Sequence, residues 1–221
     1  MAREVRETLD SQGSALIRAH LPEIPSFEAL SAFGVICRLP GLNAVQTLAP
    51  RQISDSTPNT YSGNFGRNAF PLHTDLAHWY VPPRYLALRC TGPRSSVGTR
   101  LLDTASIIEA FGITALNRAL VRPRRPIQGY RPLLRLLEDR GCGLSSIRWD
   151  GLFISPATQE SAKVFDAIGV FLGFAQPQEI VLAEKGDTLI IDNWRLLHGR
   201  APISAAQTFR RVERAYIGEL R

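Results

Sequence analysis

The chain has 221 residues, enough for one domain with a sizeable hydrophobic core, and we expect a single domain over residues 1–221. No apolar run is long enough to span a bilayer and no signal peptide is evident, so we expect a cytoplasmic protein with no membrane partner. The formal net charge of +6 comes from arginines spread along the chain, which disfavours a nucleic-acid-binding stripe.

Only two of the 26 basic residues are lysines, Lys163 and Lys185. The densest local run of arginines, Arg122, Arg124 and Arg125, lies in a proline-broken loop, and an anionic substrate is compatible with it. The three cysteines have no metal-type spacing and are odd in number, so we expect them to be reduced. The sequence does not predict the oligomeric state.

The first third of the chain alternates short helices with short strands. Residues 1–11 predict a polar helix that ends near Gly13, followed by a strand at 15–17 on a sheet edge. A helix over 26–33, capped by Ser26, leads to a strand at 35–37. Residues 41–68 are rich in Ser, Thr, Asn, Pro and Gly, which is typical of a functional loop in a compact domain.

The middle of the chain predicts strands at 85–90 and 97–102, separated by a turn at Gly92-Pro93. The pattern then favours a helix over 103–119 and another over 132–138, which has its proline in the first turn. A β-hairpin is predicted over 145–154, with its turn at Asp150-Gly151.

Residues 158–174 form the clearest amphipathic helix, with apolar side chains on one side and polar ones on the other. Strands at 179–183, 188–191 and 209–217 complete the chain. Many short strands with a few helices indicate a mainly β fold, a sandwich or barrel with helices packed on one side.

Two short motifs, His73-Thr74-Asp75 and His198-Gly199-Arg200, contain two of the four histidines. Two histidines and one carboxylate are the ligand set of a non-heme Fe(II) site with open positions for substrate and oxygen. His73 and Asp75 are two residues apart, so on a strand they project from one face, and His198 could complete the triangle from a distant strand. Without further matches, an ordinary loop pair and a satisfied core histidine would be the favoured explanation of these residues.

The further matches lie around these motifs and follow the same order along the chain. With them, the sequence resembles the Fe(II)/2-oxoglutarate-dependent dioxygenases of the taurine dioxygenase and clavaminate synthase-like superfamily, from about Tyr61 to Tyr216. The resemblance implies a double-stranded β-helix (jelly roll), His73, Asp75 and His198 as metal ligands and catalytic centre, and Fe(II), 2-oxoglutarate and O2 as cofactor and cosubstrates. The matching segments are His73-x-Asp75, Pro82-Pro83-Arg84-Tyr85-Leu86, Leu88-Arg89-Cys90, Gly98-Thr99-Arg100, Asp192-Asn193, His198-Gly199-Arg200 and Arg210 to Tyr216.

Alternation along the last strand puts Arg210 and Arg214 on one face and Arg211 and Glu213 on the other. A buried guanidinium needs an anion as partner, and a carboxylate binds it bidentately. The resemblance implies that Arg210 and Thr99 bind the distal carboxylate of 2-oxoglutarate. Arg214 would then bind its other end or an anionic group of the substrate. A register shift of one residue would give the role of Arg210 to Arg211.

Candidates for substrate binding surround the first motif, since loops at a barrel mouth usually supply specificity. They are Tyr61, Asn64, His78 and Arg148, with Arg214. Trp79 and Tyr80 could equally pack the loop, and Asp150, beside Trp149, also suits a hairpin turn.

The resemblance implies hydroxylation of an unactivated C–H bond of a small molecule, with an amino acid or an intermediate of specialised metabolism as the first expectation. The carboxylate at Asp75 disfavours halogenation, because halogenases of the superfamily have a small residue there. Two alternatives remain: the same site catalysing desaturation or cyclisation, and a metal- or ligand-binding jelly roll without turnover.

Overall fold

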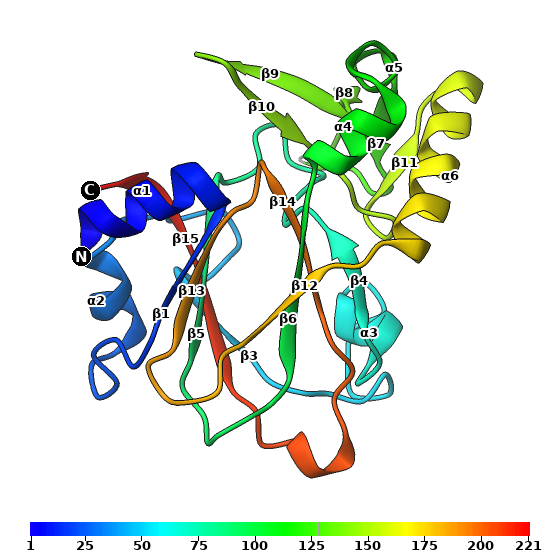
Figure 1. Ribbon diagram of the computed structural model, residues 1–221. Helices are drawn as coiled ribbons and strands as arrows, with labels where there is room; N and C mark the ends of the chain where they lie inside the picture. The colour runs from blue at the N-terminus through cyan, green and yellow to red at the C-terminus, as the bar shows by residue number, and fades with distance from the viewer. Residues whose placement is uncertain (128) are drawn as a thin grey trace.

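A computed structural model describes residues 1–127 and 129–221 as antiparallel sheets with helices on their outer sides (Figure 1). The larger sheet has the strand order β1-β13-β5-β15-β2, and β3 also pairs with β15. The last strand of the chain is therefore internal to this sheet. Its strands are β1 (Ser14–Ile17), β2 (Gly34–Ile36), β3 (Val45–Leu48), β5 (Tyr85–Cys90), β13 (Thr188–Asp192) and β15 (Val212–Leu220).

The smaller sheet brings the two histidine motifs together. Its order is β12-β6-β14-β4, in which β14 (Leu196–Arg200) and β4 (Phe70–His73) carry the motifs. His198 is the register partner of His73 across these two strands. The other two strands are β6 (Gly98–Asp103) and β12 (Gln178–Val181).

The larger sheet is covered on both faces, which explains why every residue of β5 is buried. Leu86 and Leu88 of β5 pack against Leu101 and Leu196 of the smaller sheet, so this cluster fills the space between the sheets. The alternate residues Tyr85 and Ala87 face the helices α1 (Ala2–Gln12) and α2 (Ser26–Ser31).

A third layer of helices and short strands covers the far side of the smaller sheet (Figure 1). Its core includes Trp149, Phe165, Ile168 and Leu197. Thr158 caps its longest helix by accepting a hydrogen bond from the Ser161 N–H at 3.1 Å. The elements are α4 (Ala105–Phe111), α5 (Ile113–Arg118), β7 (Leu120–Pro123), β8 (Leu134–Arg135), β9 (Leu137–Gly141), β10 (Leu144–Ile147), β11 (Ile154–Pro156) and α6 (Gln159–Phe174).

Most of the predicted elements are confirmed, including both N-terminal helices, the amphipathic helix and most of the strands predicted for the two sheets. The last strand, predicted over 209–217, is instead Val212–Leu220, so Arg210 and Arg211 precede it. Gly13 ends α1 in the left-handed conformation, with φ 74°, and donates its N–H to the Leu9 carbonyl. The polar segment 41–68 contains β3 and the short helix α3 (Tyr61–Phe65). The mainly β fold with flanking helices is confirmed as well.

Four local predictions are wrong. Ser26 is the first helical residue after the cap residue Pro25, and its hydroxyl is buried without a hydrogen-bond partner among the described residues. The helix predicted over 103–119 is broken at Gly112, whose φ of 75° interrupts the helical backbone between α4 and α5.

The other two errors fall in the third layer. Residues 132–138 form β8 and β9 instead of a helix, because their leucines fill the core around Trp149. The hairpin over 145–154 does not form, since β10 pairs with β9 and β11 pairs with β7. Asp150 does make a turn, in which its Oδ1 accepts hydrogen bonds from the Leu152 and Phe153 N–H groups.

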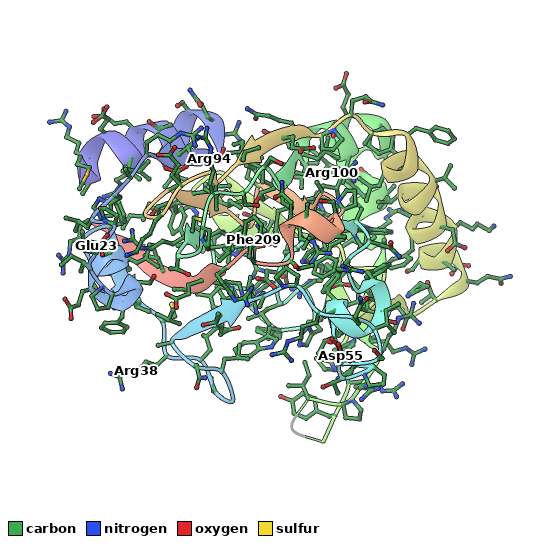
Figure 2. All side chains as sticks on the ribbon, turned by 90° about the horizontal axis from the view of Figure 1, so that it is seen from below. Glu23, Arg38, Asp55, Arg94, Arg100 and Phe209 are labelled. Carbon is green, nitrogen blue, oxygen red and sulfur yellow. The ribbon has the colours of Figure 1, made fainter. Side chains whose placement is uncertain are left out.

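Charged side chains are distributed around the molecule, with Glu23, Arg38, Asp55 and Arg94 at separate places on its rim (Figure 2). Within the described ranges, no helix is long and apolar enough to cross a bilayer.

Candidate active site

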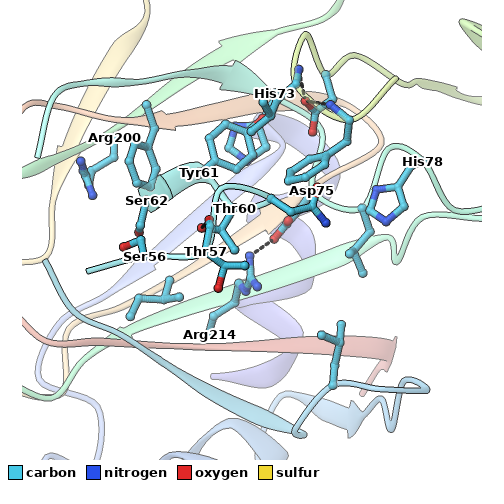
Figure 3. Close-up of a pocket in the computed structure, with 18 of the residues that line it drawn as sticks. Ser56, Thr57, Thr60, Tyr61, Ser62, His73, Asp75, His78, Arg200 and Arg214 are labelled. Atoms are coloured by element: carbon cyan, nitrogen blue, oxygen red, sulfur yellow. Dashed lines mark hydrogen bonds and ion pairs between the residues drawn. The ribbon is translucent and has the colours of Figure 1, made fainter. Parts of the chain in front are cut away.

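A cavity of about 830 Å³ opens beside the paired ends of β4 and β14. His73, Asp75 and His198 all line it, as do Thr99 and Arg210. Figure 3 shows Asp75 turned toward Arg214, with Arg200 and His78 on opposite sides of the pocket. The residues predicted to hold the metal and the cosubstrate therefore share one cavity.

The two histidines lie next to each other, with ring centroids 4.4 Å apart. The Nδ1 of His73 lies 2.9 Å from the Pro71 carbonyl, and donation of its proton there leaves Nε2 as the free nitrogen. Burial and then the nearby His73 lower the pKa of His198 to about 3, so its imidazole is neutral at pH 7. Its Nδ1 is buried without a hydrogen-bond partner among the described residues.

Asp75 is buried and held through one carboxylate oxygen. Its Oδ2 accepts hydrogen bonds from Arg214 Nη1 at 2.8 Å and from the Tyr216 hydroxyl at 2.9 Å. Burial alone would raise the pKa of Asp75, but Arg214, followed by the two histidines and Tyr216, lowers it to about 2. The carboxylate is therefore ionised at neutral pH.

Asn193, in the segment before the second motif, fixes the backbone of the first motif. The Asn193 side chain accepts a hydrogen bond from the Asp75 N–H at 2.8 Å and donates to the Asp75 carbonyl at 3.1 Å. The same amide donates to the Pro83 carbonyl at 2.9 Å. Asn193 thus ties the turn after β4 to the segment before β14.

The donor types fit an Fe(II) site: two imidazoles with available nitrogens, of which that of His198 is neutral at pH 7, and one ionised carboxylate. Within the described part of the chain, however, no group of three or more His, Cys, Asp or Glu side chains is arranged to hold a metal ion. Asp75 is engaged by Arg214 and Tyr216 through Oδ2, so Oδ1 is the oxygen left for a metal. The expected triad shares one cavity, but its three donors are not a preformed metal cluster.

Arg210 lies just before β15, lines the cavity and is only 6% exposed. Among the described residues its guanidinium has no ion-pair partner. Burial lowers its pKa, and burial followed by the charge of Arg210 lowers the pKa of Arg200 to about 10. A bound carboxylate would relieve both effects. The neighbouring Arg211 is exposed and donates to the Thr208 carbonyl.

Arg214 points into the barrel as expected, but its partner is part of the protein. It pairs with Asp75 and donates to Gln46 Oε1 at 2.6 Å. The need for an anion, which predicted a cosubstrate or substrate contact, is thus met by the candidate metal ligand itself.

Three of the five predicted substrate residues, Tyr61, His78 and Arg214, line the cavity, and Asn64 and Arg148 do not. Tyr61 stacks on His73 at a centroid distance of 4.2 Å, and His78 lines the wall with a buried Nδ1 that has no hydrogen-bond partner among the described residues. Asn64 instead donates to the Pro58 and Thr60 carbonyls and stabilises its own loop.

Arg148 is 1% exposed and lies outside the cavity wall. It donates to four backbone carbonyls and to Glu138 Oε2 at 2.7 Å, which consumes its hydrogen-bonding capacity. We correct its predicted role in substrate binding to a structural one.

This correction gives a prediction. Arg148→Met should lower the free energy of unfolding by about 3 kcal/mol or more, because four carbonyls and one carboxylate lose a buried partner. Denaturant unfolding would measure this free energy, with Arg131→Met at an exposed position as control. Unchanged stability together with a raised KM would instead return Arg148 to the substrate site.

Sequence reasoning missed the roles of Tyr216, Asn193 and Arg200. Tyr216 is two residues after Arg214, so strand alternation puts it on the same face, but nothing in the sequence links its hydroxyl to Asp75, 141 residues away. Arg200 lies inside the second motif, lines the cavity and stacks on Phe70, 3.5 Å from the ring centroid. Its position two residues after His198 in the motif could therefore have indicated that Arg200 lies at the cavity.

Tyr216→Phe should weaken Fe(II) binding by about tenfold, since a partner that orients a metal-binding carboxylate is removed. Titration of the metal-free protein with Fe(II) under anaerobic conditions would measure the dissociation constant. Tyr85→Phe is the matched control, because Tyr85 is a buried tyrosine of the same sheet that does not line the cavity. Equal affinities in the two variants would refute a role for the Tyr216 hydroxyl.

A scan against protein-family models gave no match, and a search of curated proteins gave none either. Among solved structures, the chain is similar to an asparagine oxygenase in complex with Fe(II), 3-hydroxyasparagine and succinate, with a TM-score of 0.72, 18% identity and coverage of 98% of this chain and 78% of that one. For the non-heme iron oxygenase OrfP in complex with Fe and α-ketoglutaric acid, the TM-score is 0.69, with 23% identity and coverage of 98% and 79%. For PvcB from Pseudomonas aeruginosa, the TM-score is 0.63, with 20% identity and coverage of 98% of this chain and 80% of that one. The chain therefore has the jelly-roll fold of the iron- and 2-oxoglutarate-dependent oxygenases.

Proposed function

We propose that the protein is an Fe(II)- and 2-oxoglutarate-dependent oxygenase that hydroxylates an unactivated C–H bond of a small molecule. The observation that carries the proposal is the content of one cavity: two imidazoles, an ionised carboxylate and the buried Arg210, which has no acidic partner among the described residues. An apolar jelly roll that bound only a neutral ligand would not need this combination of charges.

Different residues of the cavity would bind the metal and the cosubstrate. His73, His198 and Asp75 would hold Fe(II), and Arg210 with Thr99 would bind the distal carboxylate of 2-oxoglutarate by charge-assisted hydrogen bonds. When bound, Fe(II) together with 2-oxoglutarate and O2 supplies the oxidising power for C–H cleavage. The Pro71 carbonyl fixes the His73 ring through Nδ1, and Tyr61 stacks on this ring.

Structures with the same fold support an amino acid or an amino-acid derivative as substrate. One neighbour is an asparagine oxygenase with bound 3-hydroxyasparagine, and OrfP has been crystallised with succinate and a dihydroxylated arginine. Tyr61, His78, Trp79 and Phe153 would then form the substrate wall, since all four line the cavity beside the candidate metal ligands.

We further propose that the chain works as one domain in the cytoplasm, with a small molecule as its partner. Cys37, Cys90 and Cys142 are free, which fits a reducing compartment.

The test is to load the protein with Fe(II) anaerobically, add 2-oxoglutarate and O2, and measure succinate in the presence of amino acids and their acylated or carrier-bound derivatives. The expected result is substrate-dependent succinate and a product heavier by one oxygen atom. A product lighter by two hydrogen atoms would assign desaturation or cyclisation instead. No succinate above the metal-free control, with 2-oxoglutarate affinity unchanged in Arg210→Ala, would overturn the proposal.

A further inference from the structure

Three arginines at the mouth of the cavity have no role in the proposed chemistry. Arg51 lies in the loop between β3 and α3, and Arg124 and Arg125 follow β7. All three are exposed, and no carboxylate of the described residues lies within 4.0 Å of their nitrogens. Among the described residues, the side-chain hydrogen bond of this group is a long one, from Arg124 to the Gly151 carbonyl at 3.3 Å.

The acidic residues of the cavity are already engaged. Asp75 is bound by Arg214 and Tyr216, and Asp150 is 1% exposed with Oδ1 held by two backbone N–H groups. Asp55 belongs to the same loop as Arg51, but it does not line the cavity and lies beside α3 in Figure 2. The wall therefore carries six arginines against two aspartates: Arg51, Arg124, Arg125, Arg200, Arg210 and Arg214 against Asp75 and Asp150.

This surplus has a physical consequence. Like charges gathered around a cleft raise the local concentration of anions and attract anionic ligands into it. Guanidinium groups bind carboxylate and phosphate oxygens in a planar, bidentate geometry. The cosubstrate accounts for Arg210, and Asp75 accounts for Arg214, but neither reaches the exposed arginines of the mouth.

We propose that the substrate carries an oxyanion, a phosphate or a carboxylate, remote from the carbon that is oxidised, and that Arg124 and Arg125, which line the same cavity as Arg51, bind it at the mouth. The inference rests on the proposed function and deepens it by naming a substrate class. The cavity of about 830 Å³ lies in the upper part of the range of about 300–1,000 Å³ that is typical of small-molecule sites, so it can take 2-oxoglutarate and a substrate extended by such a group.

The chain is rich in arginine, so the test needs arginines that differ only in position. Arg122 and Arg131 are exposed and flank the same loop, but they do not line the cavity. Calorimetry on metal-free protein, with Arg210→Ala as the background to remove the cosubstrate site, would measure binding of pyrophosphate and of tricarballylate. These two probes separate a phosphate site from a carboxylate site.

Adding Arg124→Gln and Arg125→Gln should weaken the preferred probe by about tenfold or more, because two charge-assisted contacts are lost. Adding Arg122→Gln and Arg131→Gln should change its affinity less than about twofold, the size of a screened, distant charge effect. Equal losses in the two pairs, or no binding of either probe, would overturn the inference.

Turnover gives a second readout, in which succinate formation is compared between O-phospho-L-serine and L-serine and between L-glutamate and L-glutamine. A preference for the anionic member that disappears in the Arg124→Gln, Arg125→Gln protein supports the inference, and a preference for the neutral member contradicts it. Arginine-dependent anion binding without any succinate would refute the proposed function and leave the anion site standing. Succinate formation without arginine-dependent anion binding would refute the anion site alone.

Discussion

His198→Leu is expected to abolish Fe(II) binding while leaving the metal-free protein at least as stable as the wild type. The buried Nδ1 of His198 has no hydrogen-bond partner among the described residues, and burial holds the pKa of the ring at about 3. A polar group of this kind costs about 1–3 kcal/mol of stability, and leucine has a similar volume without that cost. Such a cost at one buried position is typical of a site selected for function.

The chain offers a matched control in His20. This histidine is also buried, but its Nε2 lies 3.1 Å from the Ala29 carbonyl and it does not line the cavity. His20→Leu should therefore lower the free energy of unfolding by about 1–2 kcal/mol without changing Fe(II) affinity. Chemical unfolding of the two metal-free variants gives their free energies of unfolding, and an Fe(II) titration of each gives its dissociation constant. Strong Fe(II) binding by His198→Leu would remove this residue from the ligand set.

Local pattern was sufficient where one physical effect dominated. The amphipathic helix α6 and the buried strands β5 and β13 follow from hydrophobic periodicity, and Gly13 marks the end of α1. Alternation along the predicted last strand also separated the buried Arg210 from the exposed Arg211, although both residues lie just before β15. These features depend on residues close together in the chain.

Pattern failed where a distant partner decided the outcome. The leucines of 132–138 have a spacing compatible with a helix, but they form strands because β7 and β10 pair with them. Arg148 and Arg214 show the same limit for charges. The sequence predicted substrate or cosubstrate contacts for these two arginines, but it did not show that Arg148 binds carbonyls of its own fold or that Arg214 binds Asp75.

The ion pair between Arg214 and Asp75 bears on how the site is organised. An ionised carboxylate buried beside two histidines would otherwise be costly, and Arg214 with Tyr216 compensates it without a metal. Gln46 in turn fixes the Arg214 guanidinium from β3. Arg214 and Tyr216 therefore compensate the charge of Asp75, whereas no carboxylate of the described residues pairs with Arg210, so this is the part of the cavity that needs an anion.

Arg210→Ala should test that imbalance directly. Removing one partner of a buried, hydrogen-bonded charge pair costs about 2–4 kcal/mol, so 2-oxoglutarate should bind roughly 30- to 1,000-fold more weakly. The dissociation constant would be measured by calorimetry under anaerobic conditions with Fe(II) present. Without metal, Arg210→Ala should be no less stable than the wild type, because the wild-type Arg210 has no ion pair to lose among the described residues.

Arg211→Ala is the control, one residue further along the chain, with an exposed side chain that bonds only to nearby backbone carbonyls. Its 2-oxoglutarate affinity should stay within about twofold of wild type, since the charge is outside the cavity and screened by solvent. The reverse pattern, a large loss in Arg211→Ala and little change in Arg210→Ala, would mean that β15 is shifted by one residue and that every inward position assigned to it is wrong. Equal losses would indicate that a general positive potential, and no single guanidinium, attracts the cosubstrate.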